Sequence, residues 1–290
     1  MGIEYIFPDT GVQLYRLTST RELLKSHVHD YPTAAIFGGI DYNLANSNTA
    51  TDRRNDEAAY NHAKTKNLKF RNLQHSAYEC RSIDSIRHTE ADTLVYGAAA
   101  SEYNFRQMAG DYNMLFISTH GYCRTTARFE SSDFPWKDKI DHSLSESGLV
   151  FCGFNAEQAA RSGTGYTDGI VSARELCEMD MHNVGLCVVS ACEGALGRAS
   201  ADGTYGIQRG LKSAGVDAMV LSLWEVDDNA TRLFMTYLYS ILAEGKNVHR
   251  AFWEARRMLR QHKESLTSPR PFTPYNKPRY YNAFILVDAI

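Results

Sequence analysis

The sequence has no apolar run near the roughly 20 residues that a bilayer-spanning helix needs, and its first residues lack the basic and apolar regions of a secretion signal. It also lacks a charge excess, because 31 basic residues stand against 34 acidic ones. These absences argue against a membrane or nucleic-acid partner and favour a cytoplasmic protein. With 290 residues, 43% of them apolar, the chain is long enough to bury a sizeable core.

Paired cysteines and a metal-ligand cluster are also missing. The six cysteines are scattered without a CxxC pair, which fits neither a disulfide framework nor a zinc site and is typical of a reducing compartment. His27 and His29 lie two residues apart, but no cluster of partner ligands is nearby. Gly163 and Gly165 lack the third glycine of a dinucleotide loop, because position 168 is aspartate. We therefore expect no metal and no cofactor.

The order of patterns along the chain predicts an α/β fold. Residues 1–92 suggest a hairpin at 3–18, a short helix at 19–24, a strand at 34–39 and a polar insertion at 42–69, all within the same domain as the core at 93–290. In that core, strands are expected at 94–97, 114–119, 148–152, 184–190, 218–223 and 282–287, and helices at 101–108, 172–179, 205–214, 229–243 and 248–262. Such alternation favours a mostly parallel sheet with helices on both faces.

Two of the predicted strands end at reactive side chains. The strand at 114–119 runs into His120 and Gly121, and the strand at 184–190 runs into Cys192. If these strands are neighbours in a parallel sheet, their carboxyl ends place imidazole and thiol at one edge. An imidazole beside a thiol favours the thiolate, which is the nucleophile. The backbone N–H groups of Gly121 and Cys192 would then stabilise a developing oxyanion.

The same residues have plainer interpretations. A single cysteine at the end of a buried strand is commonly a small core residue, and a His-Gly pair is commonly a turn. Spacing alone does not choose between catalysis and packing.

Several segments, in order, resemble one family: 15–23, 35–39, 101–105, 118–121, 168–175, 189–193, 222–228 and 281–286. The family is the CHAT domain, a caspase-like peptidase module that often follows TPR repeats in bacteria and is related to separase. The resemblance implies a caspase–hemoglobinase fold and a cysteine endopeptidase whose dyad is Cys192 and His120. Its partners would be a protein substrate and a regulatory protein or TPR-type partner. Because Ser-Ala precedes Cys192 where caspases have Gln-Ala, aspartate specificity is not expected.

The segment after the strand at 218–223 bears on specificity. In separase-like relatives a similar segment lines the pocket for the residue before the cut, which implies that Asp228, with Asp227 beside it, receives a basic side chain. Ser222 belongs to the same segment, and Trp224 would form an apolar wall. The alternative is that these aspartates open the following helix, where acidic residues are favoured.

Two function classes stay open at this point. One is the peptidase, with the polar stretches at 42–69 and 124–147 acting as loops that gate the site. The other is a non-catalytic caspase-like interaction module that binds a protein partner.

Overall fold

A computed structural model of the chain describes residues 15–25, 30–44, 68–123, 142–155, 168–191, 198–200, 203–224, 226–263 and 273–289. The start of the expected N-terminal hairpin and most of both polar stretches lie outside these residues, as does position 192.

The main sheet has six strands within the described residues. In spatial order they are β11 (Phe284–Val287), β10 (Ala218–Ser222), β7 (Leu186–Ser190), β3 (Met114–Ser118), β1 (Ala34–Gly38) and β2 (Thr93–Tyr96). Only the edge strand β11 runs antiparallel to its neighbour, and all other neighbours in the sheet are parallel. The predicted α/β fold with a mostly parallel sheet is therefore confirmed.

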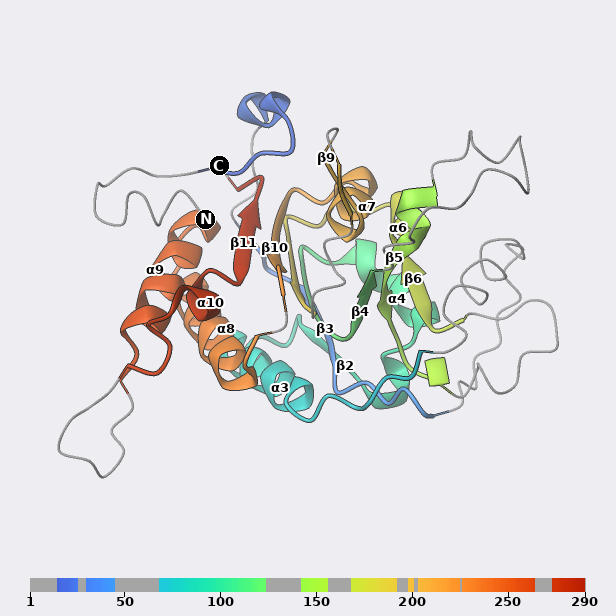
Figure 1. The fold of residues 1–290 in the computed structure, drawn as a ribbon, viewed down its shortest axis with the longest axis horizontal. Coiled ribbons are helices and arrows are strands. Elements are labelled where there is room, and N and C mark those ends of the chain that lie inside the picture. The colour runs from blue at the N-terminus through green and yellow to red at the C-terminus, as the bar shows by residue number, and fades with distance from the viewer. Residues whose placement is uncertain are drawn as a thin grey trace.

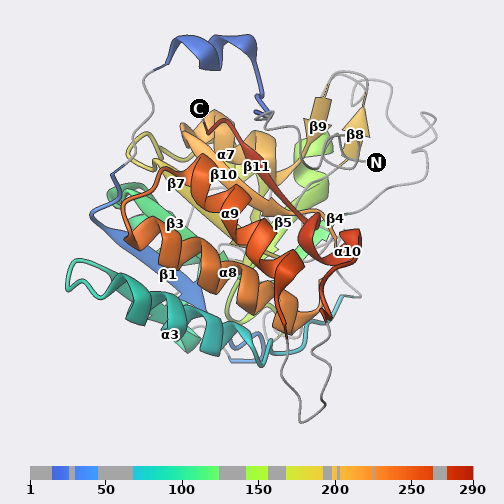
Figure 2. The same ribbon diagram turned by 90° about the vertical axis from the view of Figure 1, so that its left-hand side faces the viewer.

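Helices cover both faces of this sheet (Figures 1 and 2). On one face lie α3 (Ser76–Arg87), α8 (Asp228–Ala243) and α9 (Val248–Gln261), and α10 (Pro278–Tyr281) follows beside them. On the other lie α4 (Glu102–Met108), α6 (Ala173–Cys177) and α7 (Ile207–Ala214). Short 3-10 turns are η1 (Thr20–Leu24), η2 (Gly97–Ala99), η3 (Ala109–Asp111) and η5 (His142–Glu146).

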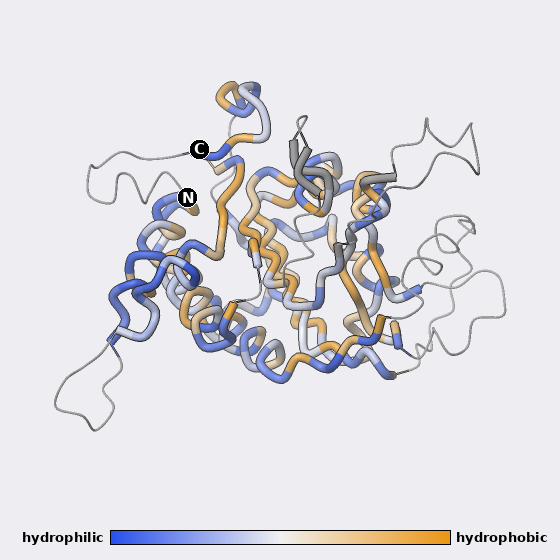
Figure 3. The backbone as a smooth tube through the Cα atoms, viewed as in Figure 1, coloured by the Kyte–Doolittle hydropathy of each residue, from blue (hydrophilic) through white to orange (hydrophobic). Residues whose placement is uncertain are grey.

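Burial on both faces explains why the central strands read as continuous apolar runs. In β3, Phe116 packs towards α3, α8 and α9, and Ile117 packs towards the opposite helices. Val188 and Val189 divide in the same way in β7. Because both sides of such a strand are dry, no polar alternation is needed. Figure 3 shows the apolar residues gathered along these strands.

Two small antiparallel sheets accompany the main one within the described residues. One consists of β4 (Gly121–Cys123), β5 (Ser147–Val150) and β6 (Ile170–Ser172), and the other of β8 (Arg198–Ser200) and β9 (Gly203–Tyr205). The strand expected at 148–152 exists as β5 but lies outside the main sheet, so that β3 and β7 are direct neighbours.

Helix α3 is an element that the sequence patterns did not predict. Its buried face consists of Ser76, Glu79, Cys80 and Ile83, which stand at the i, i+3, i+4 and i+7 positions of a helical stripe. Two of these four positions carry polar side chains, so the apolar periodicity that marks a helix in a sequence is weak here. The polar residues of this stripe reach the edge of the sheet where the predicted catalytic strands end.

Candidate active site

Three neighbouring strands of the main sheet each end in serine. Ser118 of β3 and Ser190 of β7 are register partners, and Ser222 of β10 follows Leu221, which pairs with Val189. Side chains alternate along a strand, so these serines continue the row of core residues that faces α3 and α8. Three hydroxyls therefore line one edge of the sheet, at the carboxyl ends where sites form in parallel sheets.

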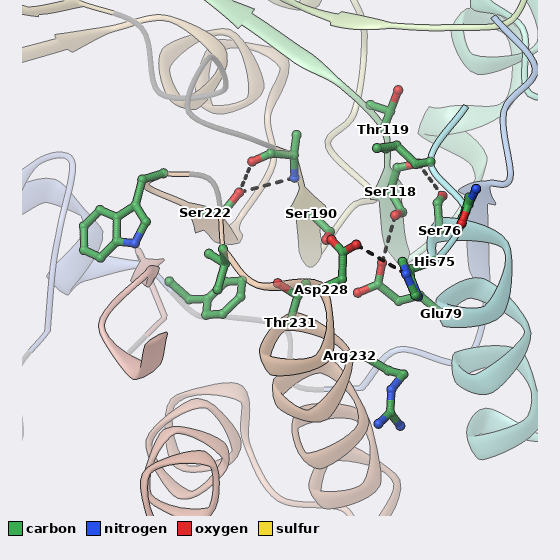
Figure 4. Close-up of a pocket in the computed structure, with 16 residues that line it drawn as sticks. His75, Ser76, Glu79, Ser118, Thr119, Ser190, Ser222, Asp228, Thr231 and Arg232 are labelled. Atoms are coloured by element: carbon green, nitrogen blue, oxygen red, sulfur yellow. Dashed lines mark hydrogen bonds and ion pairs between the residues drawn. The ribbon is translucent and has the colours of Figure 1, made fainter. Parts of the chain in front are cut away.

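A cleft opens at this serine row, and the empty space within and in front of it, open solvent included, is about 610 Å³. Its walls come from the first turns of α3 and α8 and from the segment after β10 (Figure 4). The residues that line it are Leu73, Gln74, His75, Ser76, Glu79, Ser118, Thr119, Ser190, Ala191, Ser222, Trp224, Val226, Asp228, Thr231, Arg232 and Phe284. It lies next to the ends of β3 and β7, from which the chain continues to His120 and Cys192.

The His120 ring is held by groups from two other parts of the chain, residues 70–71 and Tyr42. Its Nε2 lies 2.8 Å from the carbonyl oxygen of Arg71. The rings of Phe70 and Tyr42 lie at centroid distances of 4.9 and 5.1 Å from the imidazole. The backbone N–H of His120 donates to the Tyr42 hydroxyl at 3.3 Å, and this hydroxyl is also 3.0 Å from the Thr119 hydroxyl.

The contact with Arg71 fixes which nitrogen of His120 carries the proton. A carbonyl oxygen only accepts hydrogen bonds, so Nε2 is the donor. In the neutral imidazole the other nitrogen, Nδ1, then has no proton and is the basic one. This tautomer leaves an unprotonated ring nitrogen just beyond the end of β3.

Position 192 lies outside the described residues, but the peptide that leads into it is fixed. The backbone N–H of Ala191 donates to the Ser222 hydroxyl at 3.2 Å, and the same hydroxyl donates to the Ala191 carbonyl oxygen. Because Ser118 and Ser190 are register partners in parallel strands, positions 120 and 192 each follow two residues after adjacent strand ends. Gly121, the expected oxyanion donor, begins β4 directly after His120.

Of the residues expected to bind substrate, Ser222, Trp224 and Asp228 line the cleft. Asp227 is not among the lining residues, because its carboxylate caps α8 and accepts from the Ala230 N–H at 3.0 Å. The N-cap interpretation of this segment thus holds for Asp227. Asp228 is the first residue of the helix, and its carboxylate lies at the cleft rim, 65% exposed, with His75 3.4 Å away.

Glu79 is a cleft residue that the sequence analysis missed. It is 6% exposed, and its Oε2 accepts from the Ser118 hydroxyl at 2.8 Å. Burial raises the pKa of this carboxyl to about 7, in spite of the Ser118 and Ser190 hydroxyls, which favour the charged form, and with a smaller upward contribution from Asp228. The available signal was an acidic residue in the buried stripe of α3, four residues before Ile83.

No three histidine, cysteine, aspartate or glutamate side chains within the described ranges gather as ligands for a metal ion. Among the described helices, none has the length and apolar character that crossing a bilayer requires.

The parallel sheet, with neighbouring strands running into a histidine and a cysteine, has the arrangement of the caspase-like class of α/β domains. Comparison with protein-family models agrees, since the CHAT domain model matches residues 11–289. The chain therefore belongs to the CHAT-domain family, which is caspase-like.

A mouse protein, tetratricopeptide repeat protein 28, is 29% identical to this chain over 94 residues. The aligned segment is 32% of this chain and 4% of the mouse protein, so the chain spans only a small part of that relative. The relative is named for its TPR repeats, which accords with the expected association between this family and such repeats.

Proposed function

We propose that the protein is a cysteine endopeptidase whose nucleophile is Cys192 and whose base is His120. The observation that carries this proposal is the hydrogen bond from His120 Nε2 to the Arg71 carbonyl. A histidine used only for packing does not need one fixed tautomer. His120 has one, and it follows β3, the direct neighbour of the strand β7 that leads to Cys192. Membership of a caspase-like family supports the same assignment.

In the first half of the reaction, His120 Nδ1 takes the proton of the Cys192 thiol as the thiolate attacks the carbonyl carbon of the peptide bond. The carbonyl oxygen becomes an oxyanion, which the N–H groups of Gly121 and Cys192 stabilise. The C–N bond then breaks, and the leaving amine takes the proton from the imidazolium. The product of this half is a thioester between Cys192 and the substrate's acyl group.

In the second half, His120 Nδ1 accepts a proton from a water molecule that attacks the thioester carbonyl. The C–S bond breaks, Cys192 recovers its proton from the imidazolium, and the carboxylic acid leaves. The Arg71 carbonyl stabilises the charged imidazolium in both halves, because it accepts the remaining N–H.

The cleft beside the dyad would take the substrate residue that precedes the cut. Asp228 at its rim supplies a negative charge for a basic side chain, and Asp227 adds a second negative charge nearby while it caps α8. Trp224 forms an apolar wall, and Ser222 holds the peptide before Cys192 in place. Substrates cut after arginine or lysine are therefore the expected class.

The dyad is tested with Cys192→Ala and His120→Ala. Each should lower kcat/KM on a peptide library by at least about 10³-fold, because members of such a unit act together. A peptidyl acyloxymethyl ketone should add one mass increment to the wild type and none to Cys192→Ala. Cys177→Ser and His182→Ala are matched controls, since the structure places both residues away from the cleft. Wild-type protein that is neither active nor labelled would overturn the peptidase and favour an interaction module.

A further inference from the structure

The floor of the cleft carries a carboxylate with unused hydrogen-bonding capacity. Glu79 Oε2 accepts from Ser118, and the Ser190 hydroxyl lies close enough to favour the charged carboxylate, but Oε1 makes no hydrogen bond of normal geometry within the described residues although it is buried. In Figure 4 the Glu79 carboxylate lies between the side chains of Ser118, Ser190 and Asp228. A buried carboxylate in this condition loses its hydration without full replacement.

We propose that Glu79 is the residue that recognises the substrate side chain in this cleft, and that it selects a side chain ending in guanidinium. This inference rests on the proposed peptidase function and moves the main determinant of specificity from the cleft rim to its floor. Ser118 and Ser190 each stand two residues before a member of the dyad, so a side chain bound at Glu79 belongs to a residue at the cut bond or next to it.

Charge and geometry favour guanidinium over other groups. Its five N–H donors form a planar fork that suits a carboxylate such as Glu79, and hydroxyls that can accept from further donors line the same cleft. A cation there also offsets the repulsion between Glu79 and Asp228, which contributes to the raised pKa of Glu79. An ammonium group is a compact, strongly hydrated charge and cannot form the same planar set of bonds.

The other titratable groups around Glu79 do not supply this cation. Arg232 of α8 lines the cleft, but in Figure 4 its side chain turns away from Glu79, and its guanidinium carbon lies 6.0 Å from the Tyr78 ring centroid. His75 of α3 lies against Asp228 at the rim. Cys80 of α3 and Tyr239 of α8 are buried beside Glu79, and burial raises both pKa values well above the ordinary range, so both stay uncharged near neutral pH.

A consequence is that the preference for a substrate with arginine before the cut depends on pH. Because burial raises the pKa of Glu79 to about 7, the ionised fraction that attracts guanidinium grows as the pH rises through this value. Arginine itself does not titrate in this range. The preference for arginine over citrulline, its uncharged isostere, should therefore rise as the pH rises from 6 to 8.

The experiment uses two peptides that differ only in arginine or citrulline before the cut. For the wild type at pH 8, the ratio of their kcat/KM values should exceed that of Glu79→Gln by about 10- to 100-fold, the usual effect of a hydrogen bond to a charged group. The ratio for Glu79→Gln should not change with pH. Asp228→Asn and His75→Gln report the contribution of the rim, and the exposed Glu90→Gln is the matched control.

The proposal would be overturned if Glu79→Gln showed the same ratio of kcat/KM values for the two peptides as the wild type. If that variant does not fold, a wild-type ratio that is equal at pH 6 and pH 8 overturns it as well. Failure of the peptidase itself is distinguished by calorimetry with both peptides on Cys192→Ala. Arginine-selective binding that requires Glu79, in a protein that cleaves neither peptide, would sustain the recognition site and reject the peptidase.

Discussion

Buried glutamates on the two faces of the main sheet lie in different surroundings. On the α4 and α6 face, Arg106 Nε donates to Glu102 Oε1 at 2.9 Å, and Arg106 Nη2 donates to Glu175. Glu102 Oε2 also accepts from the Gly169 N–H at 2.9 Å. On the α3 face, no cation among the described residues pairs with Glu79, whose Oε2 accepts from a serine hydroxyl.

This difference in surroundings gives Glu102 and Glu175 a structural role, and it is consistent with the recognition role proposed for Glu79. Although burial alone would lower it, the pKa of Arg106 is raised because Glu175 and Glu102 lie against it. Burial, Asp168 and Glu175 raise the pKa of Glu102 as well, and Arg106 opposes that rise, so this cation is part of the folded structure. It ties α4 to the capping box that begins α6, where Glu175 accepts from the Ser172 N–H at 2.8 Å. Glu79 lines an open cleft instead, so its cation can come from a ligand.

The largest effect that follows from this comparison concerns Arg106→Met. Removing the cation leaves Glu102 and Glu175 buried and facing each other, so the free energy of unfolding should fall by about 3 kcal/mol. Denaturant unfolding at pH 7.5 measures this loss. Arg250→Met, which removes an exposed ion pair with Glu254, should cost less than about 1 kcal/mol. Equal losses in the two variants would contradict a structural role for Arg106.

The Glu79→Gln substitution should instead raise the free energy of unfolding, and the size of this increase should depend on pH. The folded-state pKa of Glu79 is about 7 instead of 4.5, so the folded protein holds this proton more tightly than the unfolded chain does. Stability contributed by this group therefore falls as the pH rises from about 4.5 to 7, and the glutamine variant avoids that fall. Relative to wild type, Glu79→Gln should gain about 1–3 kcal/mol between pH 5 and pH 8.

Unfolding midpoints measured at both pH values for wild type, Glu79→Gln and the exposed Glu90→Gln test this gain. The serine hydroxyls around Glu79 can accept as well as donate hydrogen bonds, so the glutamine amide fits the site. A difference between Glu79→Gln and wild type that does not change with pH would remove the distinction between the two carboxylate environments.

The main sheet was predictable because its strands are apolar over their whole length. The runs that end at Ser118 and Ser190 gave both the strands and the positions of His120 and Cys192 just beyond them. The place of the strand near residue 148 was not predictable, since an apolar run does not say to which sheet a strand belongs.

The floor and one wall of the site could not be predicted from the sequence. The buried stripe of α3 carries Glu79 and Ser76 where apolar residues would mark a helix, so the apolar periodicity that predicts a helix is weak there. The Arg71 contact uses a backbone carbonyl, which any residue provides. The roles of Asp227 and Asp228 depend on the residue at which α8 begins, and helix boundaries are uncertain by one or two residues in any sequence pattern.

The most direct test of this contrast is the titration of Glu79 itself. Carbon-13 NMR of protein labelled at glutamate carboxyls, in the Cys192→Ala background, isolates its signal as the one lost in Glu79→Gln. The structure predicts a midpoint near pH 7 for the free protein, and a midpoint at least one pH unit lower when an arginine peptide is bound. A midpoint near 4.5 in the free protein, or one that the arginine peptide does not move, would contradict the account.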